Sequence, residues 1–322
     1  MTAKTKPLAV VPHDHPLQMA GSAHLGRLEE RTHLQLHSDP VTTVDEQLRR
    51  AHGAEIIINS RGALTWPGEV LRQLPELKMI TTCSIGIDSI DVAAARELGI
   101  AVSNVPGRTA KVVAEHALAL LLAAARRLSF MTAELRNGRW SGVKNSTLQD
   151  KRLGVIGTGA IGGEMIRLGR AIGMQVQAWT FHPSAERAAQ LDVNFVELDE
   201  LLSTSDAISI HCKLTEDSRH LIGRRELSLL RPGSFLINTA RGAVVDTAAL
   251  IEALDSGHLG GAGLDVYDIE PLPSDAPILA CEHVVLTPHN ADQSPEGMEL
   301  LNGGAVDNVL AFLDGKPQNQ VN

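Results

Sequence analysis

The chain has 322 residues, of which 43% are hydrophobic, and a formal net charge of −9 at pH 7. This length suffices for two domains with packed cores, and the composition argues against intrinsic disorder. A net negative charge without a basic cluster disfavours nucleic acids and anionic membranes as partners.

Three cysteines, an odd number without C-x-x-C spacing, predict neither a disulfide framework nor a cysteine zinc site. The N-terminal residues include lysines but no apolar signal core. The most apolar stretch, residues 110–125, contains charged residues and falls short of a membrane span of about 20 residues. His13 and His15 lie in a short loop without further ligands, so we expect no metal site. These features together indicate a cytoplasmic protein.

In the first hundred residues, short apolar runs alternate with helical patterns. The expected strands span residues 8–11, 33–36, 54–59, 78–83 and 100–103. The expected helices span residues 18–30, 44–52, 70–74 and 92–98. Strands separated by helices predict a parallel sheet with right-handed crossovers.

The pattern breaks at Pro106 and Gly107, after which helices are expected at 109–127 and 131–137. A second alternation follows, with strands near 153–156, 174–179, 206–210, 234–238, 261–264 and 283–286. A last helix, 295–313, returns past this alternation. We therefore expect two α/β domains, one of residues 1–103 with 291–322 and one of residues 104–290, with a ligand cleft at the two crossings.

The stretch 153–162 carries the strongest functional signal. An apolar strand runs into Gly157, Gly159 and Gly162, which fit G-x-G-x-x-G, and a helix begins near Ala160. The first glycine permits a tight turn, the second lets a diphosphate approach the backbone, and the third lets the helix pack closely on its strand. Because helix N-termini attract phosphates, this context predicts a dinucleotide site.

Three chemistry-bearing residues each follow a strand of the second domain. Arg241 follows the strand ending near 238, Glu270 lies in DVYDIEP (265–271), and His289 follows VVLTP (284–288). Ligands of open parallel sheets bind at the carboxyl ends of the strands, so we expect these side chains to face one crevice.

The motifs occur in a characteristic order: GTGAIG (157–162), NTARGAVVD (238–246), GLDVYDIEPLP (263–273) and TPHNADQ (287–293). Together with CSIGIDSIDV (83–92) and NVPGRTAKVVAEHALAL (104–120), they make the chain resemble the D-isomer-specific 2-hydroxyacid dehydrogenases over most of its length. The resemblance implies two doubly wound parallel-sheet lobes, a Rossmann NAD(P)-binding domain and a flavodoxin-like substrate domain, in a homodimer. It also implies hydride transfer between NAD(P)H and a small 2-keto acid, with glyoxylate or hydroxypyruvate favoured.

The three residues suit that reaction on physical grounds. Arg241 offers a forked donor that can bind a carboxylate and polarise the ketone. His289 titrates near neutrality and can donate the proton. Glu270 can orient the imidazole and favour its protonated form.

By the resemblance, Ser84, Ile85 and Gly86 face the substrate carboxylate with backbone N–H groups, together with Arg241. Phosphite-oxidising relatives carry lysine where this chain has Ile85, and formate-oxidising relatives carry glutamine in place of Glu270, which disfavours both substrates. The residues implied in cofactor binding are Gly157, Gly159, Ala160, Ile161, Gly162, Thr180, His211, Cys212, Lys213, Ala240, Asp265 and Ala291. Among these, Asp265 is expected to meet the nicotinamide carboxamide.

One departure leaves the choice between NAD and NADP open. Thr180 stands where an acidic residue commonly binds the ribose 2′-hydroxyl of NAD, so nothing repels a 2′-phosphate. No arginine stands at 181–183 to hold that phosphate, and only His182 and Arg187 are near in sequence. Lys213 is either an aid to a 2′-phosphate or a solvated surface residue. We lean slightly toward NAD because an arginine clamp is lacking.

Two further alternatives stay open. Trp140 resembles the tryptophan that glyoxylate- and hydroxypyruvate-reducing relatives insert into the neighbouring subunit, but it also fits a plain interface anchor. The contrasting function is a cofactor-sensing binding protein similar to the related transcriptional corepressors. The sequence does not identify the side chain of the substrate.

Overall fold

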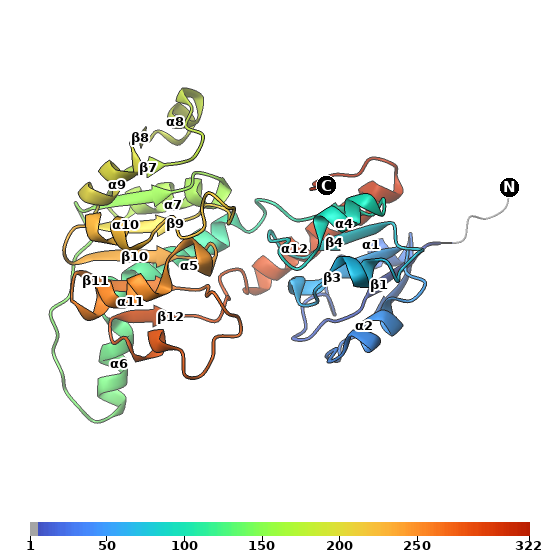
Figure 1. Ribbon diagram of the computed structural model, residues 1–322, viewed down its shortest axis with the longest axis horizontal. Helices are drawn as coiled ribbons and strands as arrows, with labels where there is room; N and C mark the ends of the chain where they lie inside the picture. Colours follow the sequence, from blue (N-terminus) through green and yellow to red (C-terminus); the bar gives the residue numbers. More distant parts are fainter. Residues whose placement is uncertain (1–5) are drawn as a thin grey trace. The chain divides into compact units, whose positions relative to one another are not determined.

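The computed structural model describes residues 6–322, which divide into two compact units (Figure 1). The first unit comprises the described residues up to Thr109 together with Gln293–Asn322, and the second is Ala110–Asp292. Both units are parallel α/β sheets, which confirms the expected fold class.

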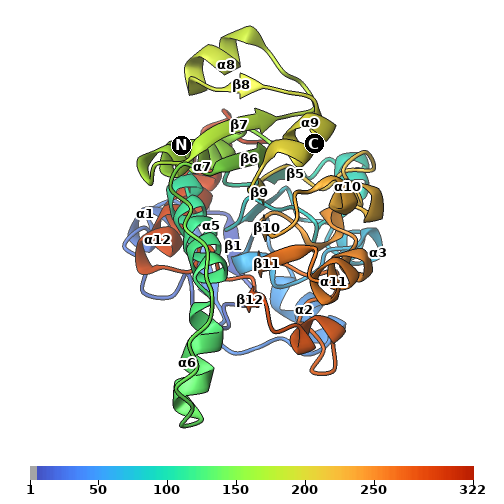
Figure 2. The ribbon, with the colours of Figure 1, turned by 90° about the vertical axis from the view of Figure 1, so that its left-hand side faces the viewer.

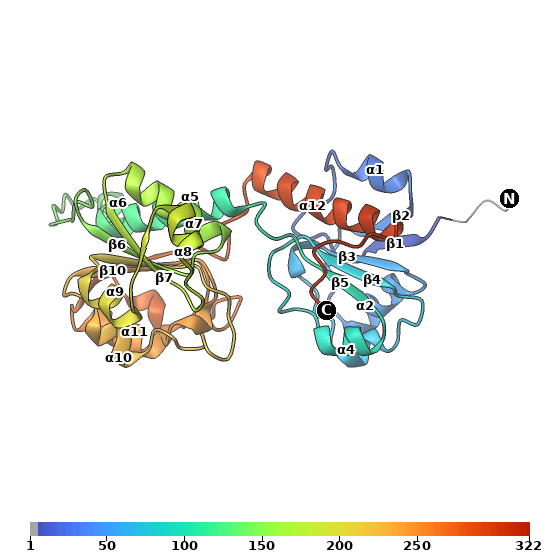
Figure 3. The same cartoon turned by 90° about the horizontal axis from the view of Figure 1, so that it is seen from above.

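The first unit is a five-stranded sheet whose strand order is typical of flavodoxin-like folds. Across the sheet the strands are β2 (His33–Leu36), β1 (Leu8–Val11), β3 (Ile56–Asn59), β4 (Met79–Thr82) and β5 (Ala101–Ser103). Helices α1 (Leu25–Glu29) and α12 (Pro295–Leu313) cover one face (Figure 3). The other face is covered by α2 (Val44–Ala51), α3 (Gly68–Leu71) and α4 (Val92–Glu97).

The apolar run in β3 shows why this sheet is central to its unit. Ile57 packs in the core with α2, α3 and α4, whereas Ile56 and Ile58 pack in the core with α12. Successive side chains of a strand point to opposite faces, so a strand covered on both faces is apolar throughout.

The second unit is a seven-stranded parallel sheet. Its strands, in order, are β12 (Val284–Leu286), β11 (Leu259–Leu264), β10 (Ser234–Asn238), β9 (Ala207–Ile210), β6 (Arg152–Ile156), β7 (Gln175–Trp179) and β8 (Asn194–Phe195). The order reverses at β6, whose neighbours are β7 and β9, as in dinucleotide-binding sheets.

Helices cover both faces of this second sheet (Figure 3). On one face lie α5 (Ala110–Ala125) and α7 (Ala160–Ala171), and on the other α9 (Leu198–Thr204), α10 (Arg224–Leu229) and α11 (Thr247–Asp255). The remaining helices are α6 (Leu128–Arg136), after α5, and α8 (Ala185–Leu191), between β7 and β8. None of the helices within residues 6–322 combines the length and apolarity needed to cross a bilayer.

One predicted helix is largely wrong. Residues 18–30 were expected to be helical, but only Leu25–Glu29 forms a helix. The buried carboxylate of Asp14 accepts hydrogen bonds from the backbone N–H groups of Gln18, Met19 and Ala20, which fixes a turn there instead. A carboxylate that accepts from successive backbone N–H groups competes with helical hydrogen bonding.

Smaller differences occur elsewhere. Strand β8 lies at the sheet edge and is only two residues long, too short for periodicity to show. Helices α5 and α6 are separated at Arg127, whose φ of 52° is left-handed, so α6 starts at Leu128 rather than near residue 131.

Helix α12 completes the first unit through one buried amide. Asn308 is fully buried; its Nδ2 donates to the Asn104 carbonyl at 2.8 Å and to Thr81 Oγ1 at 3.2 Å. Its Oδ1 accepts from Asn319 Nδ2 at 2.9 Å. A single side chain therefore joins β4, the segment after β5 and the C-terminal tail.

We predict that Asn308→Ala lowers the free energy of unfolding by about 1–3 kcal/mol, because the Asn104 carbonyl and the Asn319 amide lose a buried partner. Urea unfolding followed by circular dichroism measures the change. Gln318→Ala, at an exposed position of the same tail, should stay within about 0.5 kcal/mol of wild type. Equal stability of the two variants would contradict this role.

Candidate active site

The glycine turn between β6 and α7 is shaped by close backbone contacts. Gly157 has a φ of 89°, and a Cβ there would lie 2.6 Å from the Cys212 backbone nitrogen. A Cβ on Gly162 would lie 2.0 Å from the Gly157 carbonyl oxygen. A Cβ on Gly159, in contrast, would meet nothing within 4 Å. The turn therefore closes tightly on the protein at Gly157 and Gly162 and opens outward at Gly159, the glycine expected to face a dinucleotide diphosphate.

The ends of β7 and β9 flank this turn. Gly157 N donates to the Trp179 carbonyl at 2.8 Å, which places Thr180 beside the turn. His211 and Cys212 follow β9, and His211 N donates to the Ile156 carbonyl at 2.7 Å. Lys213, the next residue, is exposed.

His211 and Cys212 are both uncharged at neutral pH. Burial lowers the pKa of His211 to about 3, and burial raises the pKa of Cys212 to about 11. His211 Nε2 lies 2.8 Å from Ser209 Oγ, while its buried Nδ1 meets no hydrogen-bonding partner among the described residues. A buried ring nitrogen without a partner beside the turn fits a site that a bound cofactor completes.

Glu270 and His289 form a hydrogen-bonded pair. Their Oε2 and Nδ1 atoms are 2.6 Å apart, and Glu270 Oε1 accepts from the Tyr267 backbone N–H at 2.9 Å. The His289 side chain remains 46% exposed, so its Nε2 is open to a ligand while Nδ1 faces the carboxylate.

This pair shifts the titration of both groups. The hydrogen bond to Glu270 raises the pKa of His289 against the opposing effect of burial and of Arg241. Burial acts to raise the pKa of Glu270, but the hydrogen bonds from His289 and Tyr267 and the charges of His289 and Arg241 together lower it. The charge of Arg241 thus reaches both members of the pair.

Arg241 is brought to the pair by the glycine that follows it. A Cβ on Gly242 would lie 2.0 Å from the Tyr267 carbonyl carbon, so only glycine lets the loop after β10 pack on the loop that carries Glu270. Arg241 is half-buried, and its Nη1 donates to the Ala240 carbonyl at 2.7 Å. The structure thus gathers Arg241, Glu270 and His289 in the second unit, at the carboxyl edge of its sheet.

Asp265 fixes the segment that carries His289. Its carboxylate, 1% exposed, accepts from Asn290 N at 2.8 Å and from Ala291 N at 3.0 Å. Its main-chain carbonyl accepts from His289 N at 2.8 Å. His289 has a φ of 49°, a left-handed conformation that side chains such as histidine adopt only when the surroundings hold it. Asp265 therefore holds the backbone on both sides of the imidazole.

His116 also belongs to this network, and the sequence did not single it out. Its Nε2 lies 2.9 Å from Thr287 Oγ1, which donates to Asp265 at 2.6 Å, and 3.5 Å from Asp265 itself. The only sign of this role in the sequence is a histidine within the otherwise Ala- and Leu-rich helix α5. Its partners could not be identified from the sequence, because Asp265 and Thr287 lie far along the chain, beyond β10.

The remaining predicted residues are dispersed. Ala160 and Ile161 lie in the first turn of α7. Ala240 directly precedes Arg241, and Ala291 lies two residues after His289. Ser84, Ile85 and Gly86 belong to the other unit, in the loop after β4. Within residues 6–322, no hydrogen bond uses the backbone N–H of Ile85 or Gly86.

Two further side chains have structural roles. Trp66 is fully buried in the core of the first unit. His13 uses both ring nitrogens, toward the His15 carbonyl and Val41 N, and no group of three metal-type ligands occurs in the described part of the chain.

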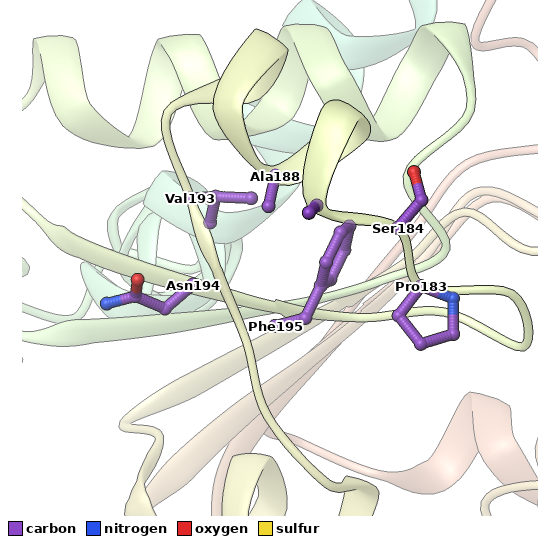
Figure 4. A pocket seen from close by; sticks show the side chains of 7 residues that line it. Pro183, Ser184, Ala188, Val193, Asn194 and Phe195 are labelled. Carbon is purple, nitrogen blue, oxygen red and sulfur yellow. The ribbon is translucent and has the colours of Figure 1, made fainter.

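An open pocket of about 440 Å³ lies beside α8 and β8 (Figure 4). Its lining contains no ionisable side chain and consists of Pro183, Ser184, Ala185, Ala188, Val193, Asn194 and Phe195. It includes none of the predicted site residues and offers no group for catalysis.

Comparison with known proteins agrees with this arrangement. Residues 118–291 match the family described as "D-isomer specific 2-hydroxyacid dehydrogenase, NAD binding domain". The chain is 39% identical over 264 residues to a glyoxylate reductase of Aeropyrum pernix, covering 79% of each chain. It is 38% identical over 291 residues to a glycerate dehydrogenase of Methylorubrum extorquens, covering 87% of this chain and 89% of the relative.

Among solved structures, the TT0316 protein from Thermus thermophilus superposes with a TM-score of 0.88 at 37% sequence identity. The match covers 98% of this chain and 100% of that one. The similarity therefore extends over both units.

We predict that Glu270→Gln lowers the pKa of His289, because a neutral amide no longer stabilises the imidazolium. The midpoint of an NMR titration of the His289 ring should move to lower pH. Asp268→Asn provides the control, because this carboxylate of the same loop bonds Thr247 instead. An unchanged midpoint in Glu270→Gln would show that the pair does not set the titration.

Proposed function

Because the chain belongs to the D-isomer-specific 2-hydroxyacid dehydrogenase family, we propose that it transfers a hydride between NAD(P)H and a small 2-oxo acid of the glyoxylate or hydroxypyruvate type. The observation that carries the proposal is the Glu270–His289 pair, 2.6 Å apart, with Arg241 close enough to influence both pKa values. These are the groups that ketone reduction requires, gathered in the unit that also contains the glycine turn.

Each group has a distinct task in the proposed reaction. Arg241 binds the substrate carboxylate and polarises the carbonyl oxygen through charge-assisted hydrogen bonds. His289 donates a proton from Nε2 to that oxygen, because Nδ1 is held by Glu270. The reduced nicotinamide, when bound, supplies the hydride to the carbonyl carbon. The carbonyl group thereby becomes an alcohol, and the histidine is left neutral.

Glu270 keeps the donor in its active form. Its carboxylate favours the imidazolium, which raises the pKa of His289, so the protonated ring persists to higher pH. Reduction should therefore be fully active below this pKa and decline as pH rises through it. Asp265 acts through the backbone of His289 and is proposed as a positioning residue; a contact with the nicotinamide carboxamide stays a proposal.

The loop of Ser84, Ile85 and Gly86 is proposed to bind the substrate carboxylate. This proposal is supported by the backbone N–H groups of Ile85 and Gly86, which donate to no acceptor within residues 6–322. Backbone N–H groups of this kind are common carboxylate donors.

We further propose that the protein is a cytoplasmic homodimer that associates through α6 and the segment after it. None of the residues of α6 is buried, and Leu128, Leu135 and Trp140 are 49%, 57% and 93% exposed. Helix α6 projects from the body of the second unit (Figure 2). Exposed apolar groups of this density mark interfaces, and a reducing compartment would keep the three free thiols reduced.

The alternative, a cofactor-sensing protein without turnover, is not favoured by the named activities of the relatives. An assay with reduced cofactor and glyoxylate, hydroxypyruvate, pyruvate and bulkier 2-oxo acids separates the two. Tight cofactor binding without turnover on any of them would support the sensor.

We predict that His289→Ala lowers kcat for the best of these acids by about 10²–10⁴-fold, because proton donation is lost. Cofactor affinity, measured by isothermal titration calorimetry, should change little, since the ring is not part of the glycine turn. His52→Ala, at an exposed position of the first unit, should match wild type in both measurements. Wild-type kinetics in His289→Ala would end the proposal.

We predict that Leu135→Asp converts the dimer to a monomer in sedimentation equilibrium, because it places a charge in the proposed apolar interface. Leu17→Asp is the matched control, since Leu17 is likewise 57% exposed but lies in the first unit. A Leu135→Asp protein that stays dimeric, or a monomeric wild type, would exclude this interface.

A further inference from the structure

Arg187 reaches back from α8 to the glycine turn. Its Nε and Nη2 donate to the Thr158 carbonyl at 3.1 and 2.6 Å, and Nη2 also approaches the Gly159 carbonyl at 3.3 Å. Its Nη1 donates to Gln190 Oε1 at 2.6 Å. A guanidinium has five N–H donors, so these four contacts leave one N–H of Nη1 available.

The partners of Arg187 are all neutral. Seven other arginines of the second unit pair with carboxylates: Arg127 with Glu282, Arg139 with Glu134, Arg167 with Glu164, Arg170 with Asp192, Arg224 with Glu252, Arg225 with Asp199 and Arg231 with Asp206. Within residues 6–322, Arg187 forms no such ion pair. A half-buried cation therefore lies at the dinucleotide turn with its charge uncompensated by any protein carboxylate in contact.

The Arg187 guanidinium lies close to the place where the ribose of a bound dinucleotide is expected. Dinucleotide-binding sheets recognise the ribose 2′ position at the end of the strand after the glycine turn, by an acid for a hydroxyl or an arginine for a phosphate. Here that strand is β7, and it ends at Thr180, which is neutral. The end of β7 bonds the turn through Gly157 N and the Trp179 carbonyl, and Arg187 bonds the next two residues of the same turn.

A second cation flanks the turn from the opposite strand. Lys213 follows Cys212, whose backbone nitrogen lies against Gly157, and it is exposed. Its own carbonyl is held by Ser218 Oγ at 2.6 Å, which fixes the loop. Positive charge therefore borders the turn on the sides of both β7 and β9.

We propose that Arg187 binds the 2′-phosphate of NADP(H), and that the chain consequently prefers the phosphorylated dinucleotide. The inference rests on the proposed function only in requiring that the glycine turn bind a dinucleotide. The sequence favoured NAD because residues 181–183 include no arginine. In the structure, however, the Arg187 side chain extends from α8 to the glycine turn, so an arginine is present there. A phosphate at this place replaces carbonyl contacts of the guanidinium with stronger, charge-assisted hydrogen bonds.

The test uses two fragments that differ only in the 2′-phosphate, adenosine 2′,5′-bisphosphate and adenosine 5′-monophosphate, titrated by calorimetry at one ionic strength. Wild type should bind the bisphosphate more tightly. Arg187→Ala should weaken the bisphosphate by about 10–100-fold, the effect of losing a charged hydrogen-bonding partner, and leave the monophosphate unchanged. NADPH and NADH, followed by their fluorescence, should repeat the same pattern.

Two further variants guard against a simple loss of structure. Thr180→Asp restores a repelling carboxylate without touching the arginine, so it should also weaken the bisphosphate selectively. Arg170→Ala is the control for loosening of α8, because Arg170 holds the other end of that helix at the Leu191 carbonyl. It should bind both fragments as wild type does.

Equal weakening of both fragments in Arg187→Ala would mean that the arginine only shapes the turn, and this result would overturn the proposal. Equal affinity of wild type for the two fragments, or an unchanged Arg187→Ala, would overturn it as well. Because the readout is binding, the proposed function fails separately: a protein that discriminates the fragments yet reduces no 2-oxo acid would disprove only the catalysis.

Discussion

The candidate site depends on one buried carboxylate. The Asp265 carboxylate is 1% exposed. In place of water, it accepts hydrogen bonds from Thr287 Oγ1 and from the backbone N–H groups of Asn290 and Ala291. Burial acts to raise its pKa, but the hydrogen bonds from His116, Asn290 and Thr287 outweigh this and lower it. A buried charge so fully bonded tolerates little displacement, because any lost partner leaves an unsatisfied charge in a medium of low polarity. Because the backbone N–H groups of His289 and Asn290 donate to Asp265, the backbone that carries the imidazole is held in place as well.

The parallel sheet brings the other groups to the same edge. Strands β6, β9, β10 and β11 all end there, so the loops after them meet regardless of their distance in sequence. Glycines determine how closely those loops approach. Gly157 lets the turn after β6 rest on Cys212, and Gly242 lets the loop after β10 rest on Tyr267. The arrangement of the candidate catalytic side chains is therefore a consequence of backbone contacts that exclude a Cβ.

The sequence predicted what depends on local pattern and motif order. It predicted both parallel sheets, the glycine turn and the strands that precede Arg241, Glu270 and His289. It did not predict the turn at residues 18–24, because the buried carboxylate of Asp14 overrides the local helical pattern. Nor did it predict the contacts of His116 and Arg187. Both side chains meet partners fixed by tertiary structure, and periodicity contains no information about a guanidinium that folds back over a neighbouring turn.

The position of α12 has a consequence for biosynthesis. This helix and the tail after it cover one face of the first sheet and pair with its edge, where Val321 N donates to the Val102 carbonyl at 2.9 Å. During translation these residues leave the ribosome only after all of Ala110–Asp292. The sheet of the first unit therefore keeps one apolar face uncovered while the second unit is synthesised. Nascent chains of this protein consequently expose an apolar surface that chaperones can bind until α12 has left the ribosome.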